Sequence, residues 1–553
     1  MATAPLVDRL AALPLGDRRL IVAMGGLALL ALVPGIGMGA LTAFARAGWL
    51  APAPDTAHAW LGWHGASVFF FWLYLAQGAL LLALAAAEPG AAEIRHRGLA
   101  SGGAGLVAIG LLLAWVAPLA GPPLLYDAPP TLAGEAPAAA GIAAASYLAL
   151  GAGLAGIALA ALATLLAAKR RNGGGPWSAL GFGLAAWAGL LLVTALAAVA
   201  TFLPAALWAV GLGPLPDQHA TRWHLLFHNL HYLPLMGTVL VWYALLPELT
   251  GVRSILGERF SKGAFALYLL LVPPTSLYHM FLEPDLAPPV RLLGSVLSLL
   301  IGVPTVAVFL VLTVSLEAAL RARGARGPLG WLRALPWGEP TFAALAAAVV
   351  NLALGGTFAF VLIQERLAPL LSDTVFVPAY FHFLTVGTVS LTALAGLGRL
   401  LPALVGGAVP APRARTLLPW LSTLGLVLFG FAGVTAGLAG MPRRTLDLSY
   451  DGVAPAAWAA SARAIALGAG VMATALAGHA LLLAAGLLGL GRRPARSLPV
   501  APSPALDAVL AAPAWGGPVA VGLLLTAIAA TTWIAVRVMH ALPLSAVGAA
   551  GGH

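Results

Sequence analysis

Apolar runs of about 20 residues recur along the whole chain, and they constrain the fold more than any other feature. A run of that length crosses the hydrocarbon core of a bilayer as a helix. About thirteen such runs can be read, beginning near Leu20, Trp60, Gly98, Ala139, Ser178, Trp223, Ala264, Leu292, Phe342, Val375, Leu417, Ala457 and Pro518. The loops between them are short and rich in Pro, Gly and Arg. The sequence therefore predicts an all-α polytopic membrane protein in which residues 1–553 form a single membrane domain.

The composition supports a membrane protein and excludes several kinds of site. Of the 553 residues, 61% are hydrophobic and only 9% are charged, whereas soluble domains carry about a quarter charged residues. The chain has no cysteine. It therefore cannot hold a thiolate metal site, an iron–sulfur cluster or a covalently attached c-type haem.

The net charge of +10 reports orientation and not a nucleic-acid partner. Basic residues lie at the amino terminus and in alternate loops, such as the one with Lys169, Arg170 and Arg171, while loops between these carry acids such as Asp127 and Glu135. Cytoplasmic loops of membrane proteins are enriched in Lys and Arg. We therefore expect a cytoplasmic N-terminus and, with an odd number of spans, a C-terminus outside.

Histidines converge on one depth of the predicted bundle. By the expected orientation, four spans bring histidine to the outer third of the membrane, below an arginine pair: His64, His224, His228, His231, His279, His382, Arg443 and Arg444. Ionisable residues at membrane depth are costly and mark functional sites by default. The alternative for His224 and His231 is a polar helix face that water satisfies near the outer interface.

Imidazole is a common ligand of haem iron and of copper. Two histidines on facing helices can hold a low-spin haem between them, and arginines at the membrane surface can pair with the haem propionates. His64 and His382, below Arg443 and Arg444, fit this scheme. The sequence thus predicts a low-spin haem site at the outer side of the bundle.

Four motifs carry a resemblance to subunit I of the haem–copper oxidases, and specifically to the B-family, ba-type cytochrome c oxidases. They are "LGWHG" with His64, "HNLHYLPLMG" with His228 and Tyr232, "SLYHMFLEPD" with His279, and "VPAYFHF" with His382, followed by the arginine pair of "MPRR". The likeness is strongest over residues 219–450. It implies that His64 and His382 bind a low-spin b-type haem, with Arg443 and Arg444 over its propionates. It also implies that His228 and His279 bind copper and that Tyr232 is the active-site tyrosine.

The sequence departs from this family at the oxygen-reducing centre. Tyr380 and Tyr278 stand where the resemblance implies a haem-binding and a copper-binding histidine. Tyrosinate favours ferric iron and lowers its potential, which does not suit an oxygen reductase. A hydroxyl-lined path resembling the family's keeps Tyr232, Tyr243, Ser298 and Thr305. Two further path positions are occupied by Val239 and Val308, which cannot relay protons.

These observations favour a respiratory membrane subunit of a prokaryotic cytoplasmic membrane. It would carry electrons through one low-spin haem b, with the oxygen-reducing centre lost or altered. The resemblance implies other subunits of a respiratory complex as partners, with a subunit II-like protein, cytochrome c or quinol as the electron donor on the outer face. No nucleic acid is expected.

Two other interpretations stay open. The chain could be an active terminal cytochrome c oxidase, or less readily a nitric oxide reductase, with an unusual centre. That centre would hold a second haem, and a copper ion bound by His228, His231 and His279. Prolines that break several spans are also compatible with a membrane transporter.

Overall fold

The computed structural model describes residues 5–121, 125, 137–214, 216, 219–252, 257–275, 288–364, 367–448 and 452–491. Within these ranges the fold is entirely helical. The helices up to the middle of the chain are α1 (Leu6–Ala11), α2 (Leu15–Arg46), α3 (Pro54–His64), α4 (Leu73–Ala86), α5 (Arg97–Val116), α6 (Pro137–Arg171), α7 (Ala179–Ala209), α8 (His219–Thr250) and α9 (Gly257–Leu271). The rest are α10 (Pro288–Leu300), α11 (Gly302–Ala322), α12 (Gly330–Arg333), α13 (Pro340–Leu362), α14 (Ala368–Leu371), α15 (Phe376–His382), α16 (Leu391–Val405), α17 (Pro412–Leu438) and α18 (Ala456–Leu487).

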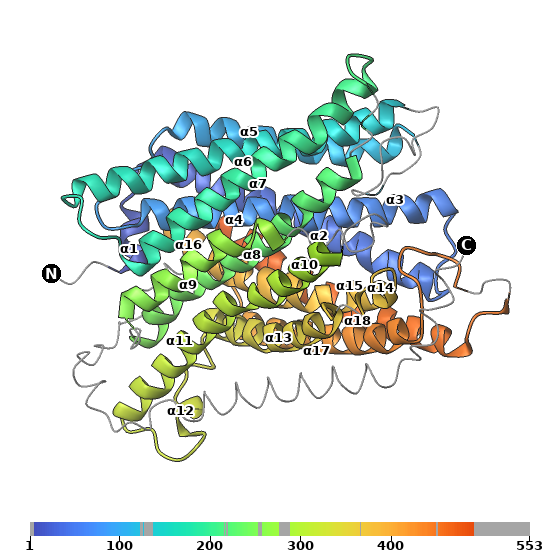
Figure 1. The fold of residues 1–553 in the computed structure, drawn as a ribbon. Helices are drawn as coiled ribbons and strands as arrows, with labels where there is room; N and C mark the ends of the chain where they lie inside the picture. The colour runs from blue at the N-terminus through green and yellow to red at the C-terminus, as the bar shows by residue number, and fades with distance from the viewer. Residues whose placement is uncertain are drawn as a thin grey trace.

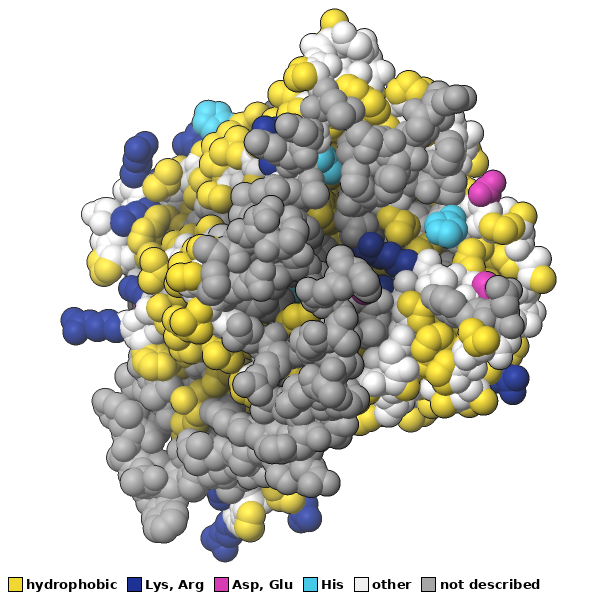
Figure 2. Space-filling view, turned by 45° about the vertical axis from the view of Figure 1, so that its right-hand side comes forward, with side chains coloured by type: hydrophobic (Ala, Val, Ile, Leu, Met, Phe, Trp, Pro, Cys, Tyr) yellow, Lys and Arg dark blue, Asp and Glu magenta, His cyan; other side chains and the backbone are white. Residues whose placement is uncertain are grey.

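Eleven helical stretches of the described chain are long and apolar enough to cross a membrane. They correspond to eleven of the predicted runs. The run near Ala264 forms α9, which has only 15 residues, and the run near Pro518 lies outside the described residues. Figure 2 agrees with a membrane-embedded surface, because hydrophobic side chains cover much of the described face and charged ones are few. The count of thirteen and the orientation stay predictions.

Prolines in the loops begin several of the long helices. Proline lacks a backbone N–H and has a fixed φ, so it suits the first turn of a helix. The helices that begin with it are α3, α6, α10, α13 and α17. The Pro-rich loops in the sequence are therefore also start signals for the helices that follow them.

The helices form a bundle in which α2, α4 and α16 lie between two outer groups (Figure 1). One outer group consists of α5, α6 and α7, which pack in sequence order, and the other includes α13, α17 and α18. A Cβ on Gly425 of α17 would lie 2.8 Å from the carbonyl oxygen of Gly468 on α18. Small residues allow such close backbone contact, which drives helix association in membranes.

Two helical stretches form the centre of the bundle. In the most apolar window of Pro54–Ala86, 94% of the residues are buried inside the protein, and in Phe376–Val405 the value is 89%, higher than in the other nine stretches. These two stretches carry His64 and His382. The predicted haem ligands are thus on the two elements that the rest of the protein surrounds.

Candidate functional site

His64 and His382 face one another across the centre of the bundle. His64 is the last residue of α3 and His382 is the last residue of α15. Their imidazole ring centroids are 6.1 Å apart, and the ring planes differ by only 8°. Two residues that are 318 positions apart in the chain are therefore brought together as a nearly parallel pair.

Each of these imidazoles uses one nitrogen for a hydrogen bond to the backbone. His64 Nδ1–H donates to the carbonyl oxygen of Gly35 at 2.8 Å, and His382 Nδ1–H donates to the carbonyl oxygen of Pro378 at 2.6 Å. A carbonyl oxygen can only accept, so the proton lies on Nδ1 in both rings. This leaves the Nε2 lone pair of each ring available to a metal, which is the usual arrangement for a metal-binding histidine.

The spacing of the two rings fits a single iron between them. Two metal–imidazole bonds of about 2 Å each, with about 1 Å from each nitrogen to its ring centre, place the centroids about 6 Å apart. The observed 6.1 Å agrees with this distance. The donor set, two neutral imidazoles with backbone-bound Nδ1 atoms, suits a low-spin haem.

A glycine on α2 makes room for the His64 ring. A Cβ built on Gly39 would lie 2.5 Å from both Cε1 and Nδ1 of His64. No real Cβ approaches a ring so closely, so His64 occupies a notch that only glycine provides at this position. Its neighbour Gly37 has no atom within 4 Å of the corresponding Cβ position.

Both histidines line a cavity of about 320 Å³. Three arginines from two other parts of the chain also line it: Arg46, Arg443 and Arg444. Arg443 and Arg444 were predicted to lie over the haem propionates, and the structure brings them to the same cavity as the histidines. The cavity therefore combines two imidazoles with an arginine rim, formed by Arg46, Arg443 and Arg444. Because arginine pairs well with carboxylates, this combination suits a haem with two propionates.

Arg46 was not anticipated from the sequence. It is the last residue of α2, and its guanidinium donates to the carbonyl oxygen of Pro442 at 2.7 Å. The predicted orientation places that end of α2 outside, where basic residues are expected to be scarce. A basic residue that breaks the charge asymmetry was thus the signal that could have identified it.

A short backbone pairing holds residues 442–444, called here the arginine segment, next to the residues that precede α15. Thr374 and Pro442 form an isolated antiparallel bridge, and the backbone N–H of Arg443 donates to the carbonyl oxygen of Asp373 at 3.0 Å. The Arg443 guanidinium also pairs with the Asp373 carboxylate at 3.0 Å. Arg444 has a φ of 66°, a left-handed conformation that is uncommon for non-glycine residues and often occurs at functional sites.

Tyr380 and His231 line the same cavity as the two facing histidines. The rings of His231 and Phe381 contact edge to face at 4.7 Å, and the ring of Tyr232 is 5.6 Å from that of His231. Tyr380 is buried, with 9% of its surface exposed. The position where the resemblance implies a second haem ligand is therefore next to the first site and is occupied by a phenol.

The predicted hydroxyl path is present only in pieces. Tyr243 and Ser261 are joined by a 2.9 Å hydrogen bond. Thr305 is bonded at 2.7 Å to the hydroxyl of Tyr268, a buried residue that the sequence reading did not include. Ser298 instead donates to the carbonyl oxygen of Gly294 in its own helix.

The predicted copper site cannot be assembled from the described part of the chain. Tyr278 and His279 lie outside the described residues, as do the side chains of His224 and His228, although α8 carries the latter two. Among the described residues there is no group of three or more His, Cys, Asp or Glu side chains that could hold a metal ion. The roles of His228, His279 and Tyr232 stay predictions.

Known proteins resemble this chain over most of its length. The sequence profile described as "Cytochrome C and Quinol oxidase polypeptide I" matches residues 19–472. Cytochrome c oxidase subunit 1 of Thermus thermophilus is 34% identical over 253 residues, which are 45% of this chain and 44% of that protein. The corresponding protein of Alkalihalophilus pseudofirmus is 27% identical over 254 residues, 41% of this chain and 37% of that one. The chain thus matches less than half the length of these relatives.

The fold also matches a solved structure. A chain of a heme-copper terminal oxidase dimer, determined by cryo-EM, superposes with a TM-score of 0.75. The match covers 92% of this chain and 91% of the other, at 20% sequence identity. At that identity the likeness concerns the fold alone.

Proposed function

Since this chain belongs to the cytochrome c and quinol oxidase polypeptide I family, we propose that it is an electron-carrying membrane subunit with one low-spin b-type haem held by His64 and His382. We further propose that its oxygen-reducing centre is lost or altered. Family membership and the eleven spans make it an integral membrane protein. The bacterial relatives indicate the cytoplasmic membrane.

One observation carries the proposal: the parallel imidazole pair at 6.1 Å, with both Nδ1 atoms bound to backbone carbonyls. Haem bound there would supply reversible one-electron chemistry. The carbonyl groups of Gly35 and Pro378 hold the two imidazoles in place, so that their other ring nitrogens are free to bind iron. The arginine rim places positive charge where carboxylates of a bound group would lie.

The altered second centre is supported by Tyr380. Family resemblance implies an imidazole there, and this chain has a buried phenol whose neutral form is a poor iron ligand. Electrons then pass to or from another protein or quinol. We propose that the partners are other subunits of a respiratory complex, with a subunit II-like protein or cytochrome c as donor at the arginine rim.

The test is haem stoichiometry. We expect the purified chain to yield one haem b per polypeptide by the pyridine haemochrome assay, with bis-imidazole absorption bands. His64→Ala and His382→Ala should each lose these bands. His479→Ala is a matched control, because His479 is also a buried histidine, 2% exposed, but does not line the cavity. Two haems per chain, with a high-spin fraction that binds carbon monoxide, would contradict the proposal.

A second candidate is a terminal oxidase with an unusual copper centre. The observation that favours it is the position of His231, which lines the cavity beside Tyr380. Copper held by His228, His231 and His279 would suit three imidazole ligands. Copper quantification on the purified chain tests it: stoichiometric copper that is lost in His279→Ala supports this candidate, and unchanged copper excludes the site. The family gives the transporter alternative no support, and we do not propose it.

A further inference from the structure

Both facing histidines are followed directly by a π-helical segment. Gly65–Trp72 begins after His64 and Phe383–Ser390 begins after His382, and each segment has eight residues. π-Helical turns are rare, and they occur frequently at functional sites. They widen the helix at the point where it leaves each ligand. Each imidazole therefore stands at the junction of an α-helix and a π-helical segment.

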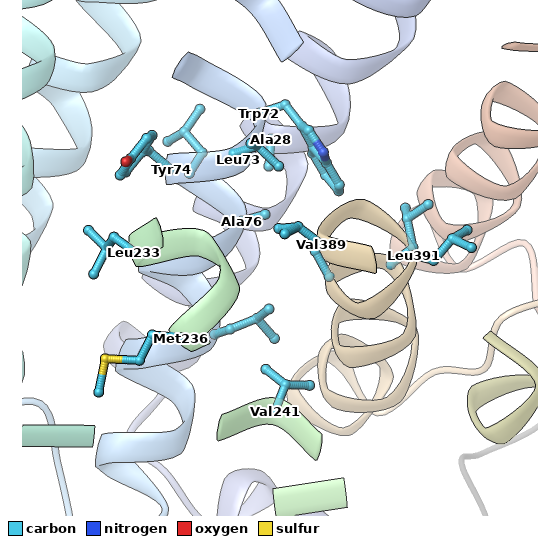
Figure 3. Packing of buried hydrophobic residues seen from close by; sticks show 14 of the residues in the cluster. Ala28, Trp72, Leu73, Tyr74, Ala76, Leu233, Met236, Val241, Val389 and Leu391 are labelled. Carbon is cyan, nitrogen blue, oxygen red and sulfur yellow. The ribbon is translucent and has the colours of Figure 1, made fainter. Parts of the chain in front are cut away.

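A hydrogen bond joins the last residues of the two segments. Trp72 Nε1–H donates to Ser390 Oγ at 2.9 Å, and both side chains are buried. Figure 3 shows the Trp72 indole extending from its helix toward the helix that carries Val389 and Leu391. Trp72 lies eight residues after His64, and Ser390 lies eight residues after His382. The bond therefore links the two segments at equal distances along the chain from the two imidazoles.

Ser390 also makes a hydrogen bond within its own π-helical segment. Its hydroxyl donates to the carbonyl oxygen of Thr385 at 2.8 Å. Ser390 also lines the main cavity and a smaller adjoining one of about 50 Å³, and both histidines line each of them. Ser390 is therefore part of the wall of both cavities that the two imidazoles line.

We propose that Trp72 and Ser390 are positioning residues for the His64–His382 site. Their hydrogen bond fixes the register of the two π-helical segments and keeps the imidazole planes nearly parallel. This inference rests on the proposed function, since it assumes that the two histidines bind a haem. It adds that the relative rotation of the ligands is set by a contact outside the ligand set.

The test uses electron paramagnetic resonance of the full chain in the ferric state. Parallel axial imidazole planes give a rhombic low-spin spectrum, and rotation toward perpendicular planes raises the largest g value. We expect Trp72→Phe and Ser390→Ala to raise it and to accelerate haem transfer to apomyoglobin about fivefold, as expected for a lost buried hydrogen bond. Ser390→Thr, which keeps the hydroxyl, should stay close to the wild type.

The chain offers a matched control in Trp242→Phe. Trp242 Nε1–H donates to Thr392 Oγ1 at 2.9 Å, again between buried side chains, but it joins α8 to α16 beyond the π-helical segment. This variant should keep the wild-type g values. If Trp72→Phe does not fold, Ser390→Ala alone decides, because it leaves the indole in place.

Two results would overturn the inference while leaving the proposed function intact. One is a wild-type low-spin spectrum in Trp72→Phe and Ser390→Ala, and the other is an equal shift in Trp242→Phe. A wild-type chain without any low-spin haem signal would instead defeat the proposed function, and this inference with it.

Discussion

Two neighbouring parts of one cavity, called here its first and second halves, differ in how well their side chains match the ligands that the family resemblance implies. In the first half, His64 and His382 face each other and the arginine rim lies nearby. In the second half, Tyr380 and His231 line the wall. Phe381 lies in the chain between Tyr380 of the second half and His382 of the first. Its ring contacts the ring of His231. One half has two facing imidazoles, and the other has a phenol where the resemblance implies an imidazole.

The first half depends mainly on backbone features that belong to the fold. Its imidazoles are oriented by the carbonyl groups of Gly35 and Pro378, and a π-helical segment follows each of them directly. Neither of these carbonyl groups belongs to Tyr380 or His231. The comparison therefore teaches that the hydrogen bonds to the facing imidazoles are separate from the side chains that line the second half.

The largest effect is expected from filling the notch behind His64. In Gly39→Ala the new methyl would overlap the His64 ring, and overpacking of this kind costs about 1–3 kcal/mol. We expect haem affinity to fall about tenfold or more, measured by titration of haem into the apoprotein. This variant displaces the His64 ring in the first half of the cavity while both histidines stay in the chain.

Gly37→Ala is the matched control for this experiment. It lies on the same helix, two residues away, and its Cβ would meet no atom within 4 Å. Haem affinity should be unchanged. Equal affinity in Gly39→Ala and the wild type would show that His64 is not held in the notch when haem is bound.

An intermediate effect is expected from removing charge at the rim. A ferrous haem carries one negative charge more than a ferric haem, so a nearby cation stabilises the reduced form. Arg46→Gln should therefore lower the midpoint potential by about 50 mV, the order expected when one charge is removed from a partly screened site. Redox titration of the low-spin bands measures the shift.

Arg413→Gln serves as the control, because exposed Arg413 lies at the other end of α17 from the arginine segment. Its potential should match the wild type. An unchanged potential in Arg46→Gln, or the same decrease in Arg413→Gln, would mean that Arg46 does not act on the haem through its charge.

The sequence predicted the parts of this site that depend on local pattern. Apolar runs located eleven spans within a few residues of their observed starts. The expected depth of His64 and His382, and the place of Arg443 and Arg444 above them, grouped these residues in the sequence. In the structure all four line one cavity, and their role in binding a haem stays a prediction. Polar residues in apolar runs are a strong signal because the bilayer makes them costly.

The parts that were missed depend on contacts between distant segments. The bond between Trp72 and Ser390 joins residues 318 positions apart, and no periodicity in either run indicates it. The π-helical segments were equally hidden, since their apolar residues fit an α-helix as well. Tyr268 was missed because its bond to Thr305 forms only when α9 packs on α11.

The smallest effect, and the sharpest test of the second half, is expected from Tyr380→Phe. If the second centre has been lost, the phenol is only a buried packing group, and its replacement by a ring of nearly the same volume leaves the His64–His382 site undisturbed. Haem per chain and the low-spin spectrum should then stay within a tenth of the wild-type values, a near-neutral outcome for such a swap. If instead the Tyr380 oxygen is an iron ligand, the variant would lose a high-spin ferric band and close to one equivalent of haem. Tyr380 lies two residues before His382 in α15. Unchanged low-spin bands in the same sample would therefore also show that α15 has kept its position. One spectrum thus reports on the two halves of the cavity separately.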